Sequence, residues 1–136
     1  ADDPELYKKA GATIVIDHHR RMANYIDDAE IFYHLPLSSS TCEMVAELIE
    51  YSTTQMDLPQ EIATALLSGI VLDTKDYVLK TSRRTFEAAA YLKRCDIDIG
   101  IVLLLTKFGK SIVIGKDIIF LSFIVIFFLC TCSKDR

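Results

Sequence analysis

A short apolar run that ends in a cluster of polar side chains constrains this chain more than any other feature. The stretch ATIVID (12–17) is rich in β-branched residues and follows Gly11, so we expect a short buried strand there. The strand leads directly into Asp17, His18, His19, Arg20 and Arg21. In open α/β sheets, ligands bind beyond the carboxyl ends of the strands. The first functional site is therefore expected at residues 17–21.

The downstream pattern predicts an α/β fold. The expected elements are a strand at 30–35 and helices at 42–51, 61–72 and 85–94. The helix at 61–72 is expected to have one apolar face. Ser40 with Glu43 three residues later has the spacing of a capping box, which marks a helix start. Strands followed by helices with short links predict a small, mostly parallel sheet flanked by helices, and two strands are too few to complete it. We therefore expect a partial parallel sheet.

Residues 99–136 differ in character from the rest of the chain. This apolar tail is dominated by Ile, Leu, Phe and Val, without evident helical or alternating polarity. Its uncharged stretch Ile118–Cys132 has 15 residues, fewer than the roughly 20 that span a membrane. Extending that run back to Ser111 reaches this length but includes Lys116 and Asp117. A membrane segment within 111–132, a pair of buried strands and an out-of-frame tail remain open.

Composition excludes some classes of protein. The chain has 136 residues, enough for one domain, and 15 basic against 19 acidic residues leave a net charge of −4. This balance argues against a protein that coats nucleic acid through a broad basic face. The four cysteines lack the spacing of a zinc site, and the chain does not open on a secretory signal, so free thiols in the cytoplasm are expected. The opening ADDPELYKKAGA lacks a methionine and indicates a fragment or a processed chain.

The DHH triplet, residues 17–19, has the donor chemistry of a metal site. Imidazole nitrogens and carboxylate oxygens together suit manganese, iron(II) or zinc better than calcium. Adjacent side chains on an extended strand point in opposite directions, so both histidines do not readily bind one ion. We expect one histidine to bind metal and the other to contact substrate, while Asp17 orients an imidazole ring.

Three further features point to phosphate. Arg20 and Arg21 carry guanidinium groups that match phosphate oxygens. The SSST stretch (38–41) precedes a predicted helix, whose first backbone amides form an anion site. Asp73 and Asp76 follow an apolar run. Together these features predict a metal-assisted phosphate site.

The arrangement resembles the DHH family of phosphoesterases, and within it the cyclic-di-AMP phosphodiesterases of the GdpP type. The resemblance spans residues 4–98. Its segments are VIDHHRR (15–21), SSSTCEMVAELIEY (38–51), IATALLSGIVLDTKDY (62–77) and TSRRTFEAAAYLKRCDID (81–98). It implies that residues 1–98 are the second half of a DHH catalytic domain. The enzymes of this type are membrane-anchored and carry their catalytic domain in the cytoplasm.

The resemblance implies a phosphodiesterase that holds two divalent metal ions, usually manganese. It assigns His18 as a ligand of one ion and Asp73 as a ligand of the other. Asp17 is expected to accept a hydrogen bond from a metal-binding imidazole ring and so to orient that ring. Two ions of this kind would stabilise both the attacking and the leaving oxygen.

The resemblance also assigns residues to the substrate. His19 and Arg20 are expected to face the scissile phosphate and to stabilise its developing charge. A weaker assignment puts Ser39, Ser40 and Thr41 near the substrate. The expected substrate is a cyclic dinucleotide or a short oligonucleotide.

Two parts of the family pattern are not found in the sequence. These are the upstream motifs that supply further metal ligands and the DHH-associated domain expected after residue 98. We therefore expect the chain to be inactive alone. The alternatives are a nanoRNase or exonuclease-like member, a non-catalytic nucleotide- or metal-binding module, and a small membrane-associated protein. A homodimer and membrane association through 111–132 are left open.

Overall fold

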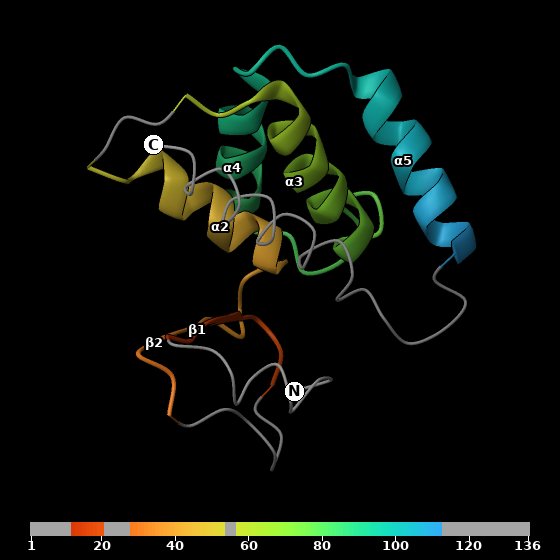
Figure 1. The fold of residues 1–136 in the computed structure, drawn as a ribbon. Coiled ribbons are helices and arrows are strands. Elements are labelled where there is room, and N and C mark those ends of the chain that lie inside the picture. The colour runs from red at the N-terminus through yellow and green to blue at the C-terminus, as the bar shows by residue number, and fades with distance from the viewer. Residues whose placement is uncertain (1–11, 21–27, 54–56, 113–136) are drawn as a thin grey trace. The chain divides into compact units, whose positions relative to one another are not determined.

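The computed structural model describes residues 12–20, 28–53 and 57–112, with side chains described as far as residue 108. The elements are β1 (Ile14–Asp17), β2 (Ile31–His34), α2 (Thr41–Glu50), α3 (Gln60–Asp73), α4 (Arg83–Lys93) and α5 (Ile99–Ile112). The chain divides into two compact units, Ala1–Leu37 and Ser38–Arg136, and each is described by itself (Figure 1). The predicted α/β class, with a partial sheet, is confirmed.

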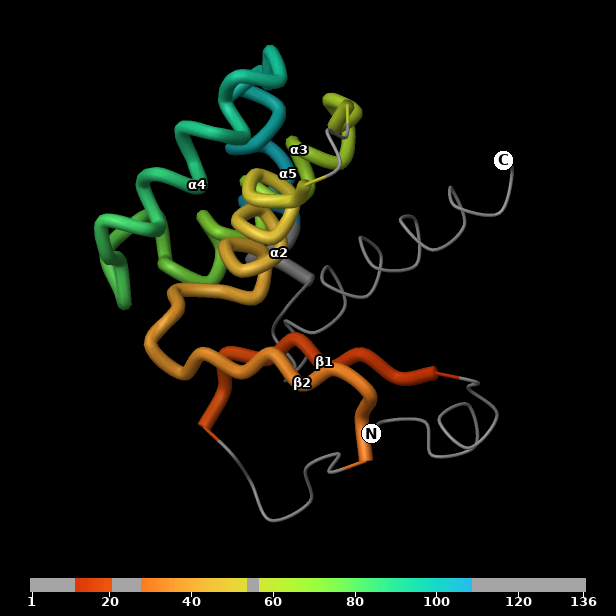
Figure 2. The backbone as a smooth tube through the Cα atoms, turned by 90° about the vertical axis from the view of Figure 1, so that its left-hand side faces the viewer, coloured from red at the N-terminus to blue at the C-terminus, as the bar shows by residue number. Residues whose placement is uncertain are grey.

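The first unit contains a parallel pair of strands. β1 and β2 run side by side with Ile14 opposite Ile31 and Asp17 opposite His34 (Figure 2). Both predicted strands and their parallel pairing are confirmed. Each strand has one exposed and three half-buried residues, so the expectation of a buried strand at 12–17 is wrong. The apolar pattern identified the strands, but in the described sheet each has only one neighbour.

The second unit is organised around α3. This helix contacts α2, α4 and α5, and Figure 1 shows it with α5 on one side and α2 and α4 on the other. Six consecutive residues, 66–71, are buried, which means that the middle of α3 is covered on all sides. The helix was predicted, but with one apolar face. Ser68 and Gly69 are buried as well, but neither is a large apolar residue. The apolar pattern of the sequence therefore predicted a narrower buried face than α3 has.

Gly69 sets how closely α2 approaches α3. A Cβ at this position would lie 2.3 Å from Sγ of Cys42 in α2, far inside van der Waals contact. The same two helices carry the fully buried side chains Met44, Leu66 and Ile70. The core of the unit therefore depends on a position without a side chain.

The first part of the apolar tail is helical. Helix α5 buries Val102 and Thr106, four residues apart on the side that packs against α3. Among the described side chains up to residue 108, most of the others are large, apolar and exposed; they include Ile101, Leu104 and Phe108. Apolar residues follow one another without interruption at the start of α5, so no helical period is visible there in the sequence. The alternative of buried strands is wrong for residues 99–112.

No helix within the described ranges is long and apolar enough to cross a membrane. The candidate membrane segment 111–132 lies outside the described residues from position 113 onward.

Candidate functional site

The DHH triplet begins where β1 ends. One carboxylate oxygen of Asp17, Oδ1, accepts hydrogen bonds from the backbone N–H of His19 (2.9 Å) and from Nδ1 of the same residue (2.8 Å). The first of these bonds closes an Asx turn, in which an aspartate accepts from the N–H two residues later. Since a carboxylate accepts, Nδ1 of His19 carries the proton, and Nε2 is left for another partner.

The Asx turn also changes how the two histidines lie. The rings of His18 and His19 have centroids 4.3 Å apart and planes inclined by 53°. Opposite orientations were expected because the sequence was read as extended through both residues. Instead the strand ends at Asp17 and the chain turns, so the rings lie next to each other. His18 is buried, with 7% of its surface exposed, whereas His19 and Arg20 are exposed.

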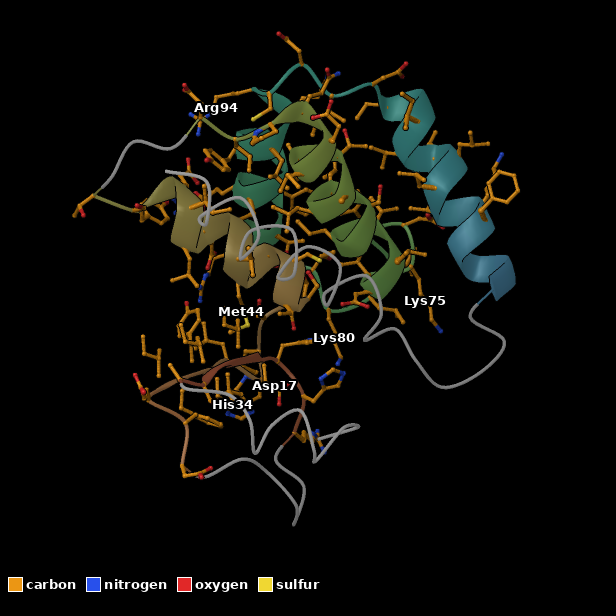
Figure 3. The ribbon with its side chains drawn as sticks, in the orientation of Figure 1. Asp17, His34, Met44, Lys75, Lys80 and Arg94 are labelled. Atoms are coloured by element: carbon orange, nitrogen blue, oxygen red, sulfur yellow. The ribbon has the colours of Figure 1, made fainter. Side chains whose placement is uncertain are left out.

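His34 contributes a third contact to His19. Its Nε2 donates to the backbone carbonyl oxygen of His19 at 2.6 Å. The contact follows from the strand register, which puts His34 opposite Asp17 at the end of the β1–β2 ladder (Figure 3). A single histidine in a strand-like stretch is a weak functional signal by itself. Only the register could have identified it, and register is not visible in a single strand.

The pKa of Asp17 is lowered in this arrangement. Partial burial of the carboxyl group acts to raise the pKa. The backbone and side-chain hydrogen bonds from His19 outweigh that effect, and the positive charge of protonated His19 and His34 adds to them. Asp17 is therefore an anion at neutral pH and a strong acceptor for the ring of His19.

In the second unit, the SSST stretch forms the start of α2. Ser39, Ser40 and Thr41 are buried. The Ser40 hydroxyl accepts from the backbone N–H of Glu43 at 3.0 Å, so Ser40 is the helix N-cap. The predicted start is confirmed, but only this half of the capping box is present, because the Glu43 carboxylate has other partners.

Glu43 is fully buried at the same helix start. Its carboxylate accepts from the hydroxyls of Ser38 (2.9 Å) and Ser39 (2.5 Å). The Ser39 and Ser40 hydroxyls that were assigned to the substrate thus have partners within the helix start. Sequence reasoning treated Glu43 only as a cap. The serines before Glu43 were the available signal, because their hydroxyls can donate hydrogen bonds to a buried carboxylate.

Asp73 is the last residue of α3 and is half-buried. The last turn of α3 holds no basic residue, and a helix carboxyl end carries partial negative charge. A positive charge is therefore electrostatically favoured near this end of α3.

A strained turn follows Asp73. Lys75, Asp76 and Tyr77 have φ values of 50°, 61° and 64°, which is the left-handed region. Each such non-glycine residue costs roughly 1–2 kcal/mol, and strain of this kind persists only where the surroundings hold it, often at functional sites. Figure 3 shows Lys75 at this turn.

Thr74 holds the turn against the end of α3. It is fully buried, and its hydroxyl donates to the Ile70 carbonyl (2.7 Å) and accepts from the Tyr77 N–H (3.0 Å). The side chain of Thr74 therefore fixes the conformation of the chain directly after Asp73.

The first unit thus brings together Asp17, His18, His19 and His34 at one strand end. Ser39, Ser40, Thr41 and Asp73 belong to the second unit. Within the ranges that the structure describes, no group of three or more His, Cys, Asp or Glu side chains has the geometry to hold a metal ion.

Comparison with known proteins identifies relatives of this chain. The DHH family, N-terminal domain, matches residues 1–70. The cyclic-di-AMP phosphodiesterase GdpP of Bacillus subtilis is 42% identical over 111 residues, and PdeA of Listeria monocytogenes, also a cyclic-di-AMP phosphodiesterase, is 43% identical over 107. These matches cover 82% and 79% of this chain and 16% of each relative. A probable manganese-dependent inorganic pyrophosphatase of Thermotoga maritima is 39% identical over 79 residues, 58% of this chain and 14% of the relative.

The similarity extends past residue 98. A match of 111 residues cannot fit within 98 positions, so it reaches at least residue 111 and includes most of α5. The change of composition at residue 99 therefore does not mark the end of the similarity. With the DHH triplet at a strand end and a family match over half of its length, the chain belongs to the DHH family.

Proposed function

We propose that this chain carries part of a metal-dependent phosphodiesterase site that acts on a cyclic dinucleotide of the cyclic-di-AMP type. The single observation that supports this most strongly is the geometry at the end of β1, where Asp17 holds the protonated Nδ1 of His19 and leaves Nε2 for an external partner. The names of two relatives supply the substrate class, and both are cyclic-di-AMP phosphodiesterases. The chain spans 16% of the length of each of these two relatives, so the activity and the substrate are proposed here for this chain.

His18 and Asp73 are the proposed metal ligands. One imidazole and one carboxylate fit manganese by donor type, and the pyrophosphatase relative is described as manganese-dependent. The location of Asp73 at the carboxyl end of α3 favours a cation for the electrostatic reason given above. When bound, two divalent ions would polarise the phosphate and supply a nucleophile from water near neutral pH.

His19 and Arg20 are the proposed phosphate contacts. Both are exposed, and a protonated His19 whose Nδ1 is held by Asp17 would donate from Nε2 to a phosphate oxygen. The guanidinium of Arg20 offers several donors in a planar fork. These groups would bind the scissile phosphate and stabilise its charge in the transition state. For Ser39, Ser40 and Thr41, we propose that the start of α2 contributes backbone N–H groups and that the hydroxyls maintain its shape.

The donor set also limits what this chain would do alone. Catalytic metal sites generally have about three protein ligands per ion, whereas the described residues do not supply three such groups together. We therefore propose that the chain binds manganese weakly and does not hydrolyse substrate at a useful rate. In that state it would act as a metal- or nucleotide-binding module.

The test is a calorimetric titration of the 136-residue chain with manganese, with cyclic-di-AMP hydrolysis followed in the same samples. His18→Ala and Asp73→Ala are each expected to weaken manganese binding at least about tenfold. Asp57→Ala, which removes an exposed acid before α3, is the matched control and should leave the affinity unchanged. Equal affinity in all variants would refute the ligand assignment. Turnover by the unaltered chain that disappears in His18→Ala would refute the incomplete site.

A further inference from the structure

We propose that His34 is a positioning residue for His19, and that it fixes the direction in which His19 presents Nε2. The inference rests on the proposed function in one respect, namely that Nε2 of His19 contacts a phosphate oxygen of the substrate. The positioning itself follows from contacts within the first unit. His34 would not touch the substrate or a metal ion.

The strand register brings His34 to this position. The parallel pairing sets His34 opposite Asp17, and the ladder continues through a hydrogen bond from the Leu35 N–H to the Asp17 carbonyl (3.0 Å). The chain leaves β1 at this level and enters the DHH triplet. A histidine on the neighbouring strand can therefore reach the main chain two residues beyond Asp17, and its Nε2 lies 2.6 Å from the carbonyl oxygen of His19.

Three polar groups of His19 are thereby engaged from two sides. Asp17 accepts from its backbone N–H and from its ring Nδ1, and His34 donates to its backbone carbonyl. The Asp17 contacts alone would leave the peptide plane after His19 free to rotate. With that plane held, the turn and the ring orientation are defined together. A reacting group must be held within about 0.5 Å of its productive position by groups of this kind.

A purely structural role for His34 makes a different prediction. Its ring also lies near that of Phe32, with centroids 5.7 Å apart. If packing on Phe32 were the whole role, phenylalanine would replace His34 without consequence for His19. If the donated hydrogen bond matters, a side chain that keeps a donor at the position of Nε2 should suffice. Glutamine reaches that position, whereas asparagine reaches only the position of Nδ1.

The test reads the tautomer of His19 by NMR. The 136-residue chain contains three histidines, so ¹⁵N-histidine labelling gives a spectrum that three single substitutions can assign. The spectra are recorded at about pH 8, because the two tautomers are distinguished in neutral imidazole rings. The unaltered chain should show His19 as the Nδ1–H tautomer. Asp17→Asn, which weakens the acceptor, should give a mixture and serves as the reference for a released ring.

The His34 variants then decide the matter. We expect His34→Gln to retain the Nδ1–H form, and His34→Asn and His34→Phe to lose it in favour of a mixture. Since Gln and Asn differ by one methylene, their comparison separates the hydrogen bond from a general loss of folding. A pure Nδ1–H tautomer in His34→Asn and His34→Phe would overturn the proposal, and so would a mixture in His34→Gln. The measurement needs neither metal nor turnover, so its outcome is independent of the manganese titration.

Discussion

The guanidinium of Arg84, at the start of α4, pairs with the carboxylate of Glu47 in α2 through two hydrogen bonds. Nε lies 2.8 Å from Oε1, and Nη2 donates to Oε2. The side chain of Glu47 is 11% exposed and that of Arg84 is 49% exposed. The pair thus joins two helices, with its acidic partner desolvated.

We expect Arg84→Met to lower the free energy of unfolding by about 1–2 kcal/mol. Loss of one partner from a fully buried pair costs roughly 3–5 kcal/mol, and the exposure of Arg84 to solvent reduces this. Urea unfolding of the whole chain measures the change. Arg84→Lys keeps the charge but not the two hydrogen bonds of the guanidinium. Its free energy of unfolding should therefore lie between those of the unaltered chain and Arg84→Met. Arg83→Met, at an exposed neighbouring pair with Glu87, is the control and should change stability by less than about 0.5 kcal/mol. Equal effects at 83 and 84 would contradict the assignment.

The close crossing of α2 and α3 gives a second prediction. Gly69→Ala introduces a Cβ that would lie 2.3 Å from the Cys42 sulfur, and overpacking of this kind costs about 1–3 kcal/mol. Cys42→Ala should relieve part of that cost, because it removes the sulfur but leaves a Cβ 3.2 Å away. A double-mutant cycle measures the coupling. Gly100→Ala in α5 meets only the end of the Asp98 side chain and should be neutral or stabilising. Additive effects at 42 and 69 would be inconsistent with the contact.

The turn after Asp73 should depend on the Thr74 hydroxyl. Thr74→Val keeps the shape of the side chain but leaves the Tyr77 N–H without the acceptor it now has at 3.0 Å. Loss of an acceptor from a buried donor costs about 1–3 kcal/mol. Because the Tyr77 N–H is only partly buried, we expect a loss of about 1 kcal/mol, measured by chemical unfolding. Thr74→Ser retains the hydroxyl and should recover most of the loss. Equal destabilisation by Ser and Val would show that the methyl group, not the hydrogen bond, is important.

Helix α5 should respond differently on its two sides. Val102 is 2% exposed, and Val102→Ala should destabilise the chain by roughly 1–3 kcal/mol. Leu104 is 53% exposed, and Leu104→Gln should change stability by less than about 0.5 kcal/mol. Thermal and urea unfolding of the two variants compare the sides directly. A larger effect at Leu104 than at Val102 would mean that the outer side of α5 is covered.

Tyr77 should make stability fall at alkaline pH. Burial raises the pKa of its phenol above 10.0, and the ring stacks on Phe86 with centroids 5.5 Å apart. Because the folded-state pKa is raised, the stabilisation is complete below the unfolded value of about 10 and is lost as pH rises through the folded value. Tyr77→Phe should reduce the slope of stability against pH in that window. The difference between the tyrosinate absorbance titrations of the two chains gives the pKa itself, and a value at or below 10 would contradict this account.

Local sequence was sufficient for most of the secondary structure. A continuous β-branched run predicted β1, and the largely apolar stretch 30–35 predicted β2. The capping-box spacing at Ser40 predicted the start of α2, and the apolar pattern predicted α3 and α4. Local sequence failed for α5, because the helix begins with the uninterrupted run IGIVLLL (99–105), and such a run does not distinguish a helix from a buried strand. The covered middle of α3 was missed for a related reason. Burial of small residues such as Gly69 is decided by how closely another helix approaches.

The candidate site divides in the same way. The identities of Asp17, His18, His19, Arg20 and Asp73, and the chemistry that they suggest, could be read from the sequence, because motif and residue type are local properties. Tertiary structure decided which polar groups meet. The contact of Asp17 with His19 depends on an Asx turn that ends the strand, the contact of His34 with His19 depends on strand register, and the partners of Glu43 depend on the fold of the serines before α2. Hydrogen bonds of this kind require two chain segments to be brought together, and no single segment of sequence contains that information.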